Sequence, residues 1–234
     1  MSYKENQDEQ SAVYGENDTF EKNDRNRVRR GHQRAAYDKK TVYSILDSHF
    51  LCHVGFSVEG QPHAIPTCHW REGNKLYWHG ASKSMMIRHL AAGNPACVTV
   101  THLDGLVLAR SAFSTSVNYR SAMCYGRPKL VTDEAEFDRQ MELFFEQIAP
   151  GRWHQLREMT AQERKATGML EMEIEDAAAK VRAAPPGDGA EGDFPVWAGI
   201  IPVRTVQDTP IEAPEGAKVA LNHTAMARYG WEKA

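Results

Sequence analysis

The stretch from His63 to Val100, HAIPTCHWREGNKLYWHGASKSMMIRHLAAGNPACVTV, sets the interpretation of the whole chain. Its apolar runs are typical of strands, its turns are rich in Gly, Asn and Pro, and it contains one short helical pattern. Strands are predicted at residues 63–70, 75–79 and 96–100, and a helix at 85–90. Turns at 71–74 and 93–95 and a loop at 80–84 connect them.

The loop before the helical pattern is a candidate phosphate-binding turn. A strand, a small-residue loop and a helix start together expose free N–H groups at the positive end of the helix dipole, and both favour an anion. Ser82 and Ser84 add hydroxyl donors and Lys83 adds a positive charge. Arg88 extends this site if its side chain leans back toward the helix start. The spacing matches neither a Walker loop nor a Rossmann fingerprint, and an ordinary solvated helix start is the alternative interpretation.

Length, charge and cysteine usage limit the class of protein. A chain of 234 residues suits one domain with extensions and buries a sizeable core. A net charge of −3 and a pI near 6.4 give no reason to expect nucleic acid or an anionic membrane as a partner. No apolar run approaches the roughly 20 residues that cross a bilayer, and the polar N-terminus is unlike a signal peptide. Four cysteines without a CxxC pair predict buried, reduced thiols in a soluble cytoplasmic protein.

The polarity of the chain predicts three parts. Residues 1–37 form a polar, flexible N-terminal extension, residues 38–206 form the folded domain, and residues 207–234 form a C-terminal tail. The basic cluster Arg25–His32 is interpreted as a solvated segment that leads into the domain, with a dedicated anion site as the alternative.

Most other apolar runs are short and strand-like. Helices are predicted to begin at Asp38 and, with Thr132 as the N-cap, at Asp133. A turn at Asp104-Gly105 separates two strands, and Gly126–Pro128 bends another. Six or seven strands with few helices predict a mainly β fold, a small antiparallel barrel with flanking helices. Beyond 96–100, the predicted strands are His49–Val58, Gln61–Trp70, Gly105–Phe113, Val117–Val131, Met169–Ile174 and Phe194–Val203.

The motifs also occur in a familiar order. They are His63–Pro66, Leu76–Ala81, Ser82–Ser84, Leu90–Pro95, and Asn118–Ser121 followed by Gly126-Arg127. Together they resemble the pyridoxamine 5′-phosphate oxidase-like superfamily of FMN-binding split β-barrels, and most of all its nitroimidazole-resistance-type flavoproteins. The resemblance covers residues 38–206 and implies a six- to seven-stranded antiparallel split barrel.

The resemblance implies a flavin site. In that family, the strand that matches His63–Pro66 lies along the isoalloxazine ring through its backbone, and the turn that matches Ser82–Ser84 holds the flavin phosphate. The family is usually a homodimer with a flavin at each interface, so Trp197 is expected to reach the partner's site. The residues assigned to cofactor binding in this way are His63, Ala64, Ile65, Pro66, Trp78, His79, Gly80, Ala81, Ser82, Lys83, Ser84, Ser121 and Trp197.

The chain also departs from the true oxidases of this superfamily. His63 stands where they have an Arg that contacts the FMN phosphate, and Cys68 stands where they have a Lys that contacts substrate. The C-terminal Arg-x-His element that recognises pyridoxal phosphate has no counterpart. Vitamin B6 oxidase activity is therefore not expected.

Histidines carry two further hypotheses. His79 is a candidate catalytic acid–base group near the flavin, with a structural strand residue as the alternative. The ten histidines raise the question of a metal, but His53, His63 and His69 lack zinc-site spacing and no cysteine pair accompanies them, so no metal site is expected.

The function expected from the resemblance is that of an FMN-dependent oxidoreductase, with FAD as the alternative flavin. A flavin takes hydride from NADH or NADPH and passes electrons to a small-molecule acceptor such as a nitro compound, a quinone or oxygen. A non-catalytic flavin carrier or redox sensor is the second hypothesis, and a haem-binding split barrel is the third.

Overall fold

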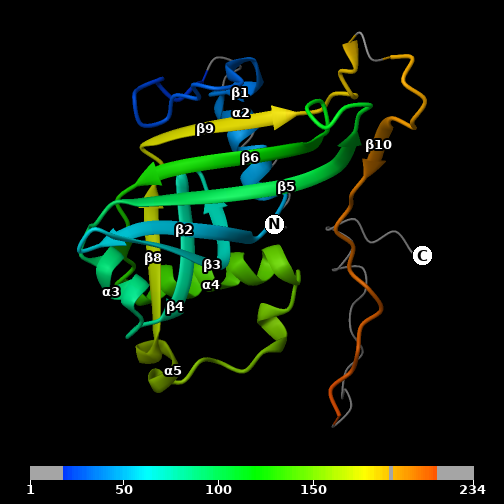
Figure 1. Ribbon diagram of the computed structural model, residues 1–234. Helices are drawn as coiled ribbons and strands as arrows, with labels where there is room; N and C mark the ends of the chain where they lie inside the picture. Colours follow the sequence, from blue (N-terminus) through cyan, green and yellow to red (C-terminus); the bar gives the residue numbers. More distant parts are fainter. Residues whose placement is uncertain (1–17, 190–191, 215–234) are drawn as a thin grey trace.

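The computed structural model describes residues 18–189 and 192–214 (Figure 1). Of the expected extensions at 1–37 and 207–234, residues 1–17 and 215–234 lie outside the described residues. Residues 18–37 pack on the domain: Phe20 is buried in its core, and Thr19 forms a β-bridge with Asp38. No helix in the described ranges is long and apolar enough to cross a membrane.

An antiparallel sheet of ten strands wraps around the core without closing (Figure 1). The strand order is β1-β9-β6-β5-β2-β3-β4-β8-β7, and β10 pairs with the far end of β5. This confirms the mainly β split-barrel fold with flanking helices, although the strands outnumber the six or seven expected. The strands are β1 (Ala35–Ala36), β2 (Leu51–Val58), β3 (Gln61–Glu72), β4 (Lys75–Ala81), β5 (Ala96–Leu108), β6 (Ser116–Gly126), β7 (Lys129–Leu130), β8 (Thr167–Glu173), β9 (Asp176–Arg182) and β10 (Gly199–Pro202).

The helices begin at side-chain caps. The Asp38 carboxylate accepts a 2.7 Å hydrogen bond from the Thr41 N–H, as the sequence predicts. The predicted cap Thr132 is wrong by one residue, because the Asp133 carboxylate accepts from the Glu136 N–H at 2.8 Å. The helices are α2 (Lys39–Asp47), α3 (Met85–Ala91), α4 (Glu134–Ile148) and α5 (Ala161–Ala166), with 3-10 turns η1 (His32–Arg34) and η2 (Trp153–Gln155).

Several predicted strand boundaries are wrong. The predicted strand Val117–Val131 ends at Gly126 in β6, and the predicted strand Gly105–Phe113 ends at Leu108 in β5. Asp104-Gly105 is a bulge inside the single strand β5, where the register shifts between Leu103 and Gly105. The Arg120 guanidinium holds the Asp104 carboxylate through two hydrogen bonds, of 2.9 and 3.0 Å, so the polar residue is satisfied without a turn. The predicted strand Phe194–Val203 is shorter in the structure, because only Gly199–Pro202 pairs with β5.

The apolar residues form two cores. The main core lies inside the sheet under α2 and includes Trp78 and Leu46, which are fully buried. A smaller core lies under α4 and joins it to β3, β4 and β8. Its members are Trp70, Tyr77, Phe137, Met141, Phe144 and Met169.

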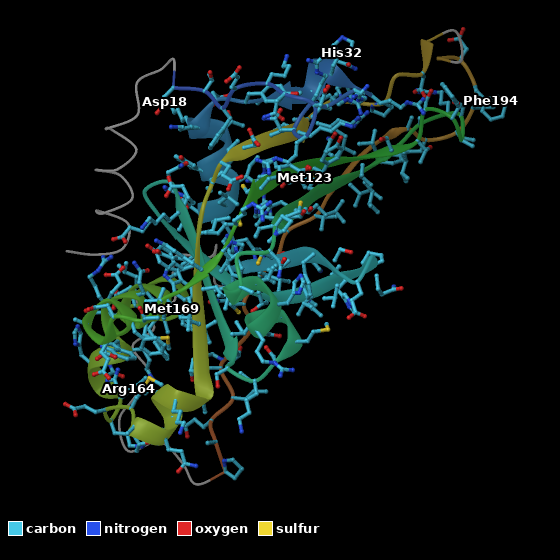
Figure 2. The ribbon with its side chains drawn as sticks, turned by 90° about the vertical axis from the view of Figure 1, so that its left-hand side faces the viewer. Asp18, His32, Met123, Arg164, Met169 and Phe194 are labelled. Carbon is cyan, nitrogen blue, oxygen red and sulfur yellow. The ribbon has the colours of Figure 1, made fainter. Side chains whose placement is uncertain are left out.

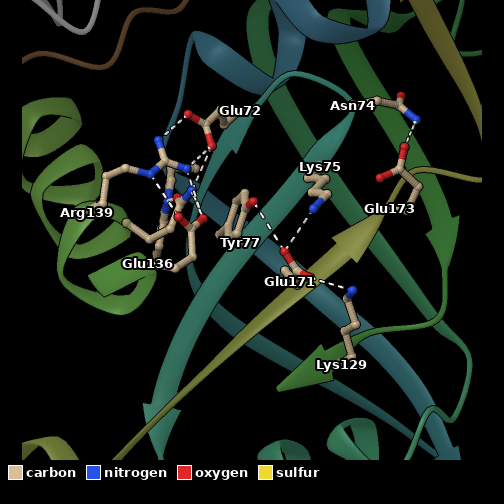
Figure 3. Close-up of polar contacts among 11 residues, drawn as sticks. Glu72, Asn74, Lys75, Tyr77, Lys129, Glu136, Arg139, Glu171 and Glu173 are labelled. Atoms are coloured by element: carbon tan, nitrogen blue, oxygen red, sulfur yellow. Dashed lines mark hydrogen bonds and ion pairs between the residues drawn. The ribbon is translucent and has the colours of Figure 1, made fainter. Parts of the chain in front are cut away.

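Polar contacts fasten α4 and β8 to the strands beside them (Figure 3). The Arg139 guanidinium pairs with Glu72 at 2.5 Å and with Glu136 at 2.9 Å. On β8, the Glu171 carboxylate accepts from Lys75 at 3.1 Å and from Lys129 at 2.9 Å. These pairs are partly exposed and each adds little free energy, so they orient the elements that the small core already holds together.

The four cysteines are free, as expected. Cys52 and Cys124 are buried, and Cys68 and Cys97 are half-buried. Burial raises the pKa of the Cys52 thiol to about 12, so this side chain stays protonated and packs as a small apolar group.

Candidate functional site

The barrel is split beside the first half of β3. Residues 61–68 of β3 pair with β2 along their whole length. Pairing with β4 covers only residues 69–72, because β4 pairs with β3 from Lys75 to Trp78 only, whereas its other edge pairs with β8 from Lys75 to Ala81. In the described part of the chain, no strand therefore covers the second edge of residues 61–68. Alternate backbone N–H and C=O groups on an open edge are free to bind a ligand.

A pocket lies where β4 ends and α3 begins. Its cavity volume is about 460 Å³, within the range of small-molecule sites. One wall comes from Ser82 and α3, and the opposite wall from Lys165 and the start of β8. The lining residues are Ser82, Ile87, Arg88, Ala91, Ala92, Leu130, Val131, Lys165, Thr167, Gly168 and Met169.

The predicted phosphate turn 82–84 lies at the mouth of this Ser82 pocket, with each side chain in a different position. The Ser82 hydroxyl donates to the Lys165 carbonyl at 2.8 Å, and the Ser82 N–H donates to the Ala166 carbonyl at 2.8 Å. Ser84 caps α3, because its Oγ accepts from the Ile87 N–H at 3.3 Å. Lys83 is exposed and does not line the pocket.

Two cations do line the pocket, Arg88 and Lys165. The position of Arg88 at the pocket can be predicted from the sequence, since this residue lies one helical turn after the cap of α3. The position of Lys165 cannot be predicted in this way, because Lys165 is distant in sequence and the residues around it have the pattern of a surface helix. The structure brings it to the site through the hydrogen bond from Ser82 to its carbonyl, which spans 83 residues.

A glycine permits the close approach of α3 to β8. A Cβ added at Gly168 would lie 2.5 Å from Ile87 Cγ2 and 3.3 Å from Ser82 Cα. Gly80 and Ala81, also predicted cofactor residues, end β4 and pair with Gly168 and Thr167. The start of α3 is therefore fixed against the floor of the pocket.

The predicted ring-binding stretch His63–Pro66 lies on the open part of β3, with side chains that alternate between two faces. His63 points inward and stacks on Phe56, with ring centroids 5.3 Å apart, and His89 of α3 contacts the same ring at 5.6 Å. Ile65 packs against the main core, while Ala64 and Pro66 face outward and are exposed. The backbone of this stretch, more than its side chains, faces the split.

Trp78 and His79 point into the two cores. Trp78 is fully buried in the main core. The His79 ring lies 4.8 Å from Phe144 and 5.9 Å from Trp70 under α4, and its Nδ1 is buried without a hydrogen-bond partner in the described residues. Desolvation lowers the pKa of His79, so the imidazole is neutral near pH 7.

Ser121 and Trp197 lie away from the Ser82 pocket in this chain. The Ser121 hydroxyl contacts the Lys180 carbonyl at 3.4 Å on the outer face of the sheet. Trp197 is 64% exposed and precedes β10, and Figure 1 shows β10 at the opposite side of the molecule from α3. Within one chain, Trp197 therefore does not line the Ser82 pocket.

The outer face of the sheet around these residues carries exposed apolar side chains. On β5 and β6, Leu103 is 46% exposed and Met123 is 42% exposed. Such a patch on a sheet face is typical of a surface that another molecule covers. Its large members are Leu51, Leu103, Leu106, Val117, Met123 and Ile201.

Comparison with known proteins agrees with this arrangement. A sequence profile of the family described as pyridoxamine 5′-phosphate oxidase matches residues 38–181. The chain belongs to this flavin-binding family. No curated protein matches the chain.

Solved structures of similar proteins support the same family. The flavocytochrome Anf3 from Azotobacter vinelandii is 39% identical, with 88% of this chain and 97% of that chain covered and a TM-score of 0.82. The FAD and haem binding protein from Mycobacterium smegmatis is 34% identical, with 79% and 91% covered and a TM-score of 0.74. A putative 5-nitroimidazole antibiotic resistance protein from Bacteroides thetaiotaomicron shares the fold at 22% identity, with 63% and 86% covered and a TM-score of 0.54.

Proposed function

We propose that this family member is a flavin-dependent oxidoreductase whose flavin lies between the open edge of β3 and the Ser82 pocket. The observation that carries the proposal is that α3 contacts both parts. It lines a pocket with two cations, which suits a phosphate, and its His89 contacts the Phe56 ring on which His63 of the unpaired strand edge stacks, and that edge suits a flat polar ring. A bound flavin would supply the redox chemistry, by taking up hydride and passing electrons on.

The residues of this chain would bind and orient the cofactor. Arg88 and Lys165 supply charge to the phosphate, and the Arg88 guanidinium also supplies paired donors. The backbone of His63–Pro66 supplies hydrogen bonds to the ring edge. Neutral His79 lies in an apolar cluster behind β4 and would have to turn out of it to act as an acid–base group, so we assign it a packing role in the cofactor-free chain.

We propose FAD as the flavin, with FMN as the alternative. The 34% identical relative is named for FAD and haem, whereas the short turn at Ser82–Ser84 led to FMN in the sequence interpretation. The pocket of about 460 Å³ lies at the protein surface and leaves room beyond one phosphate.

Haem is a second cofactor that specific observations favour. The two similar proteins described above at 39% and 34% identity are named as a flavocytochrome and as an FAD and haem binding protein. An accessible histidine nitrogen beside apolar surface is one way to hold a haem iron. His53 fits, because it is exposed on β2 near Leu51, and its side chain forms no hydrogen bond among the described residues. Bound there, haem would supply one-electron chemistry.

We propose a cytoplasmic homodimer whose apolar outer sheet face is shared between copies and whose Trp197 reaches the partner's flavin. The electron donor is NADH or NADPH, and the acceptor is a nitro compound, a quinone or oxygen. His63 and Cys68, in place of a basic pair, argue against vitamin B6 oxidation. A carrier or redox sensor is the alternative, and it would not consume the reduced donor.

An absorbance spectrum of the purified protein, recorded without oxygen before and after NADH or NADPH, tests the proposal. Flavin bands that bleach with one donor support the oxidoreductase and name its reductant, and chromatography of the released flavin separates FAD from FMN. A Soret band reports haem. A colourless protein that FAD and FMN do not reconstitute contradicts the proposal.

A further inference from the structure

A second pocket lies at the other end of the barrel from the Ser82 pocket. Its cavity volume is about 480 Å³. In Figure 2, His32 of this pocket is near the top, whereas Arg164, which precedes Lys165 on α5, is near the bottom. We call it the basic pocket, and it is separate from the proposed flavin site. Its lining residues are Lys22, Arg27, Val28, Arg29, His32, Ala35 and Tyr37.

The segment that forms the basic pocket carries an excess of positive charge. Residues 20–34 include six Lys or Arg and two acids, a formal net charge of +4 in a chain of net −3. Arg29 lies 3.6 Å from Asp24, but both side chains are more than 70% exposed and the pair is weak. Lys22 and Arg27 form no ion pair with any residue that the structure describes. Of the three Lys or Arg residues that line the pocket, Lys22 and Arg27 therefore have no counter-charge among the described residues, and Arg29 has only a weak one.

The same segment is held in place by buried contacts, unlike a solvated connector. Asn26 is 4% exposed, and its amide donates to the carbonyls of Glu21 at 2.8 Å and Ala177 at 3.3 Å. The Arg25 guanidinium pairs with Asp176 at the start of β9. The Val28 N–H donates to the Tyr37 hydroxyl at 2.9 Å. Since residues 20–34 are already ordered, binding a ligand to their cations costs little conformational entropy.

The chemistry of the lining suits a phosphorylated ligand. Arginine guanidinium groups bind phosphate through paired N–H donors, and Arg27 and Arg29 both line the pocket. Lys22 Nζ lies 4.7 Å from the centroid of the Tyr37 ring, which fixes the ammonium beside the cavity. Val28 and Ala35 form an apolar wall. We propose that the basic pocket binds a small molecule with at least two phosphate groups, either a nucleotide or free pyrophosphate.

Calorimetric titration of the flavin-loaded protein with pyrophosphate and with ADP tests this proposal. The variant is Arg27→Gln/Arg29→Gln, and the matched control is Arg30→Gln/Lys40→Gln, which removes the same charge from exposed positions outside the lining. The pocket variant should weaken Kd about tenfold or more and the control less than about twofold. The flavin spectrum should be the same in all three proteins.

The results distinguish a nucleotide from free pyrophosphate as the ligand and also show whether the proposal fails. Tighter binding of ADP than of pyrophosphate identifies a nucleotide, and equal affinities identify the phosphates alone. The proposal is overturned if neither compound binds the unmodified protein, or if both variants lose affinity equally, which indicates diffuse charge. It is also overturned if single-stranded RNA binds more tightly and depends equally on Arg30 and Lys40. None of these results bears on the proposed flavin site, because the flavin spectrum reports on flavin binding separately.

Discussion

Ser82 Oγ donates a 2.8 Å hydrogen bond to the backbone carbonyl of Lys165, so the turn before α3 and the end of α5 form one structural unit. This contact places a cation of one segment opposite Arg88 of another. The proposed anion site is therefore built from two parts of the chain that neither local sequence nor one motif connects.

Ser82→Ala should loosen this unit. The loss of one hydrogen bond should lower the free energy of unfolding by about 1 kcal/mol, and FAD should bind roughly three- to tenfold more weakly because Lys165 is less well positioned. Urea unfolding and FAD titration measure the two effects. Ser44→Ala, an exposed serine that bonds its own helix, is the control. Unchanged FAD affinity in Ser82→Ala would show that Lys165 is positioned by other contacts.

Gly168→Ala should disturb the floor of the pocket. The added Cβ would meet Ile87 Cγ2 at 2.5 Å, so we expect a loss of roughly 1–3 kcal/mol in unfolding free energy and weaker FAD binding. Combining it with Ile87→Ala frees the space, so the double variant should be less destabilised than the sum of the two single variants. Strict additivity in urea unfolding would contradict this packing account.

His69 should make the fold sensitive to acid. The ring is fully buried between the carbonyls of Phe50 and Leu46, and desolvation lowers its pKa to about 4. The unfolded chain, with a His pKa of about 6.5, therefore binds the proton first as the pH falls. About 3 kcal/mol of stability should be lost between about pH 6.5 and pH 4. NMR titration of the His69 ring checks this directly, and a midpoint near pH 6.5 in the folded protein would refute it.

Trp197→Ala should leave the folded chain almost unchanged. Trp197 is 64% exposed, so its removal should cost less than about 0.5 kcal/mol in one chain. If it covers the partner's flavin, the same variant should weaken FAD binding or dimerisation measurably. Sedimentation velocity and FAD titration are the measurements, with Phe113→Ala, also exposed, as the control. Equal FAD affinity and equal dimerisation in both variants would remove Trp197 from the site.

Much of the fold follows from local sequence. The stretch 63–100 forms the predicted strands and helix, because its apolar periodicity and its Gly-Asn and Gly-Asn-Pro turns agree with one another. The strand β9 was missed, since Ala177-Ala178-Ala179 has little β-propensity. The segment β9 is a strand because β6 pairs with all of its residues, and because the main core leaves space only for small side chains there.

The site was predictable in part for a similar reason. Ser82, Ser84 and Arg88 belong to one helix start, so sequence alone locates them. Lys165 reaches the pocket through tertiary contacts, and Trp78 points inward because the strand β4 alternates between the two cores. The basic cluster at Arg25–His32 was interpreted as solvated, yet Asn26, Tyr37 and Asp176 order it, and these contacts span residues that no local pattern relates.

The most direct test of the flavin site is the FAD affinity of Arg88→Gln/Lys165→Gln, measured by quenching of flavin fluorescence. The matched control is Lys40→Gln/Arg152→Gln, with the same charge change at exposed positions outside both pockets. We predict that the pocket variant binds FAD at least about tenfold more weakly while the control changes less than about twofold. Equal FAD affinity in the pocket variant and the unmodified protein would contradict the placement of the flavin phosphate in the Ser82 pocket.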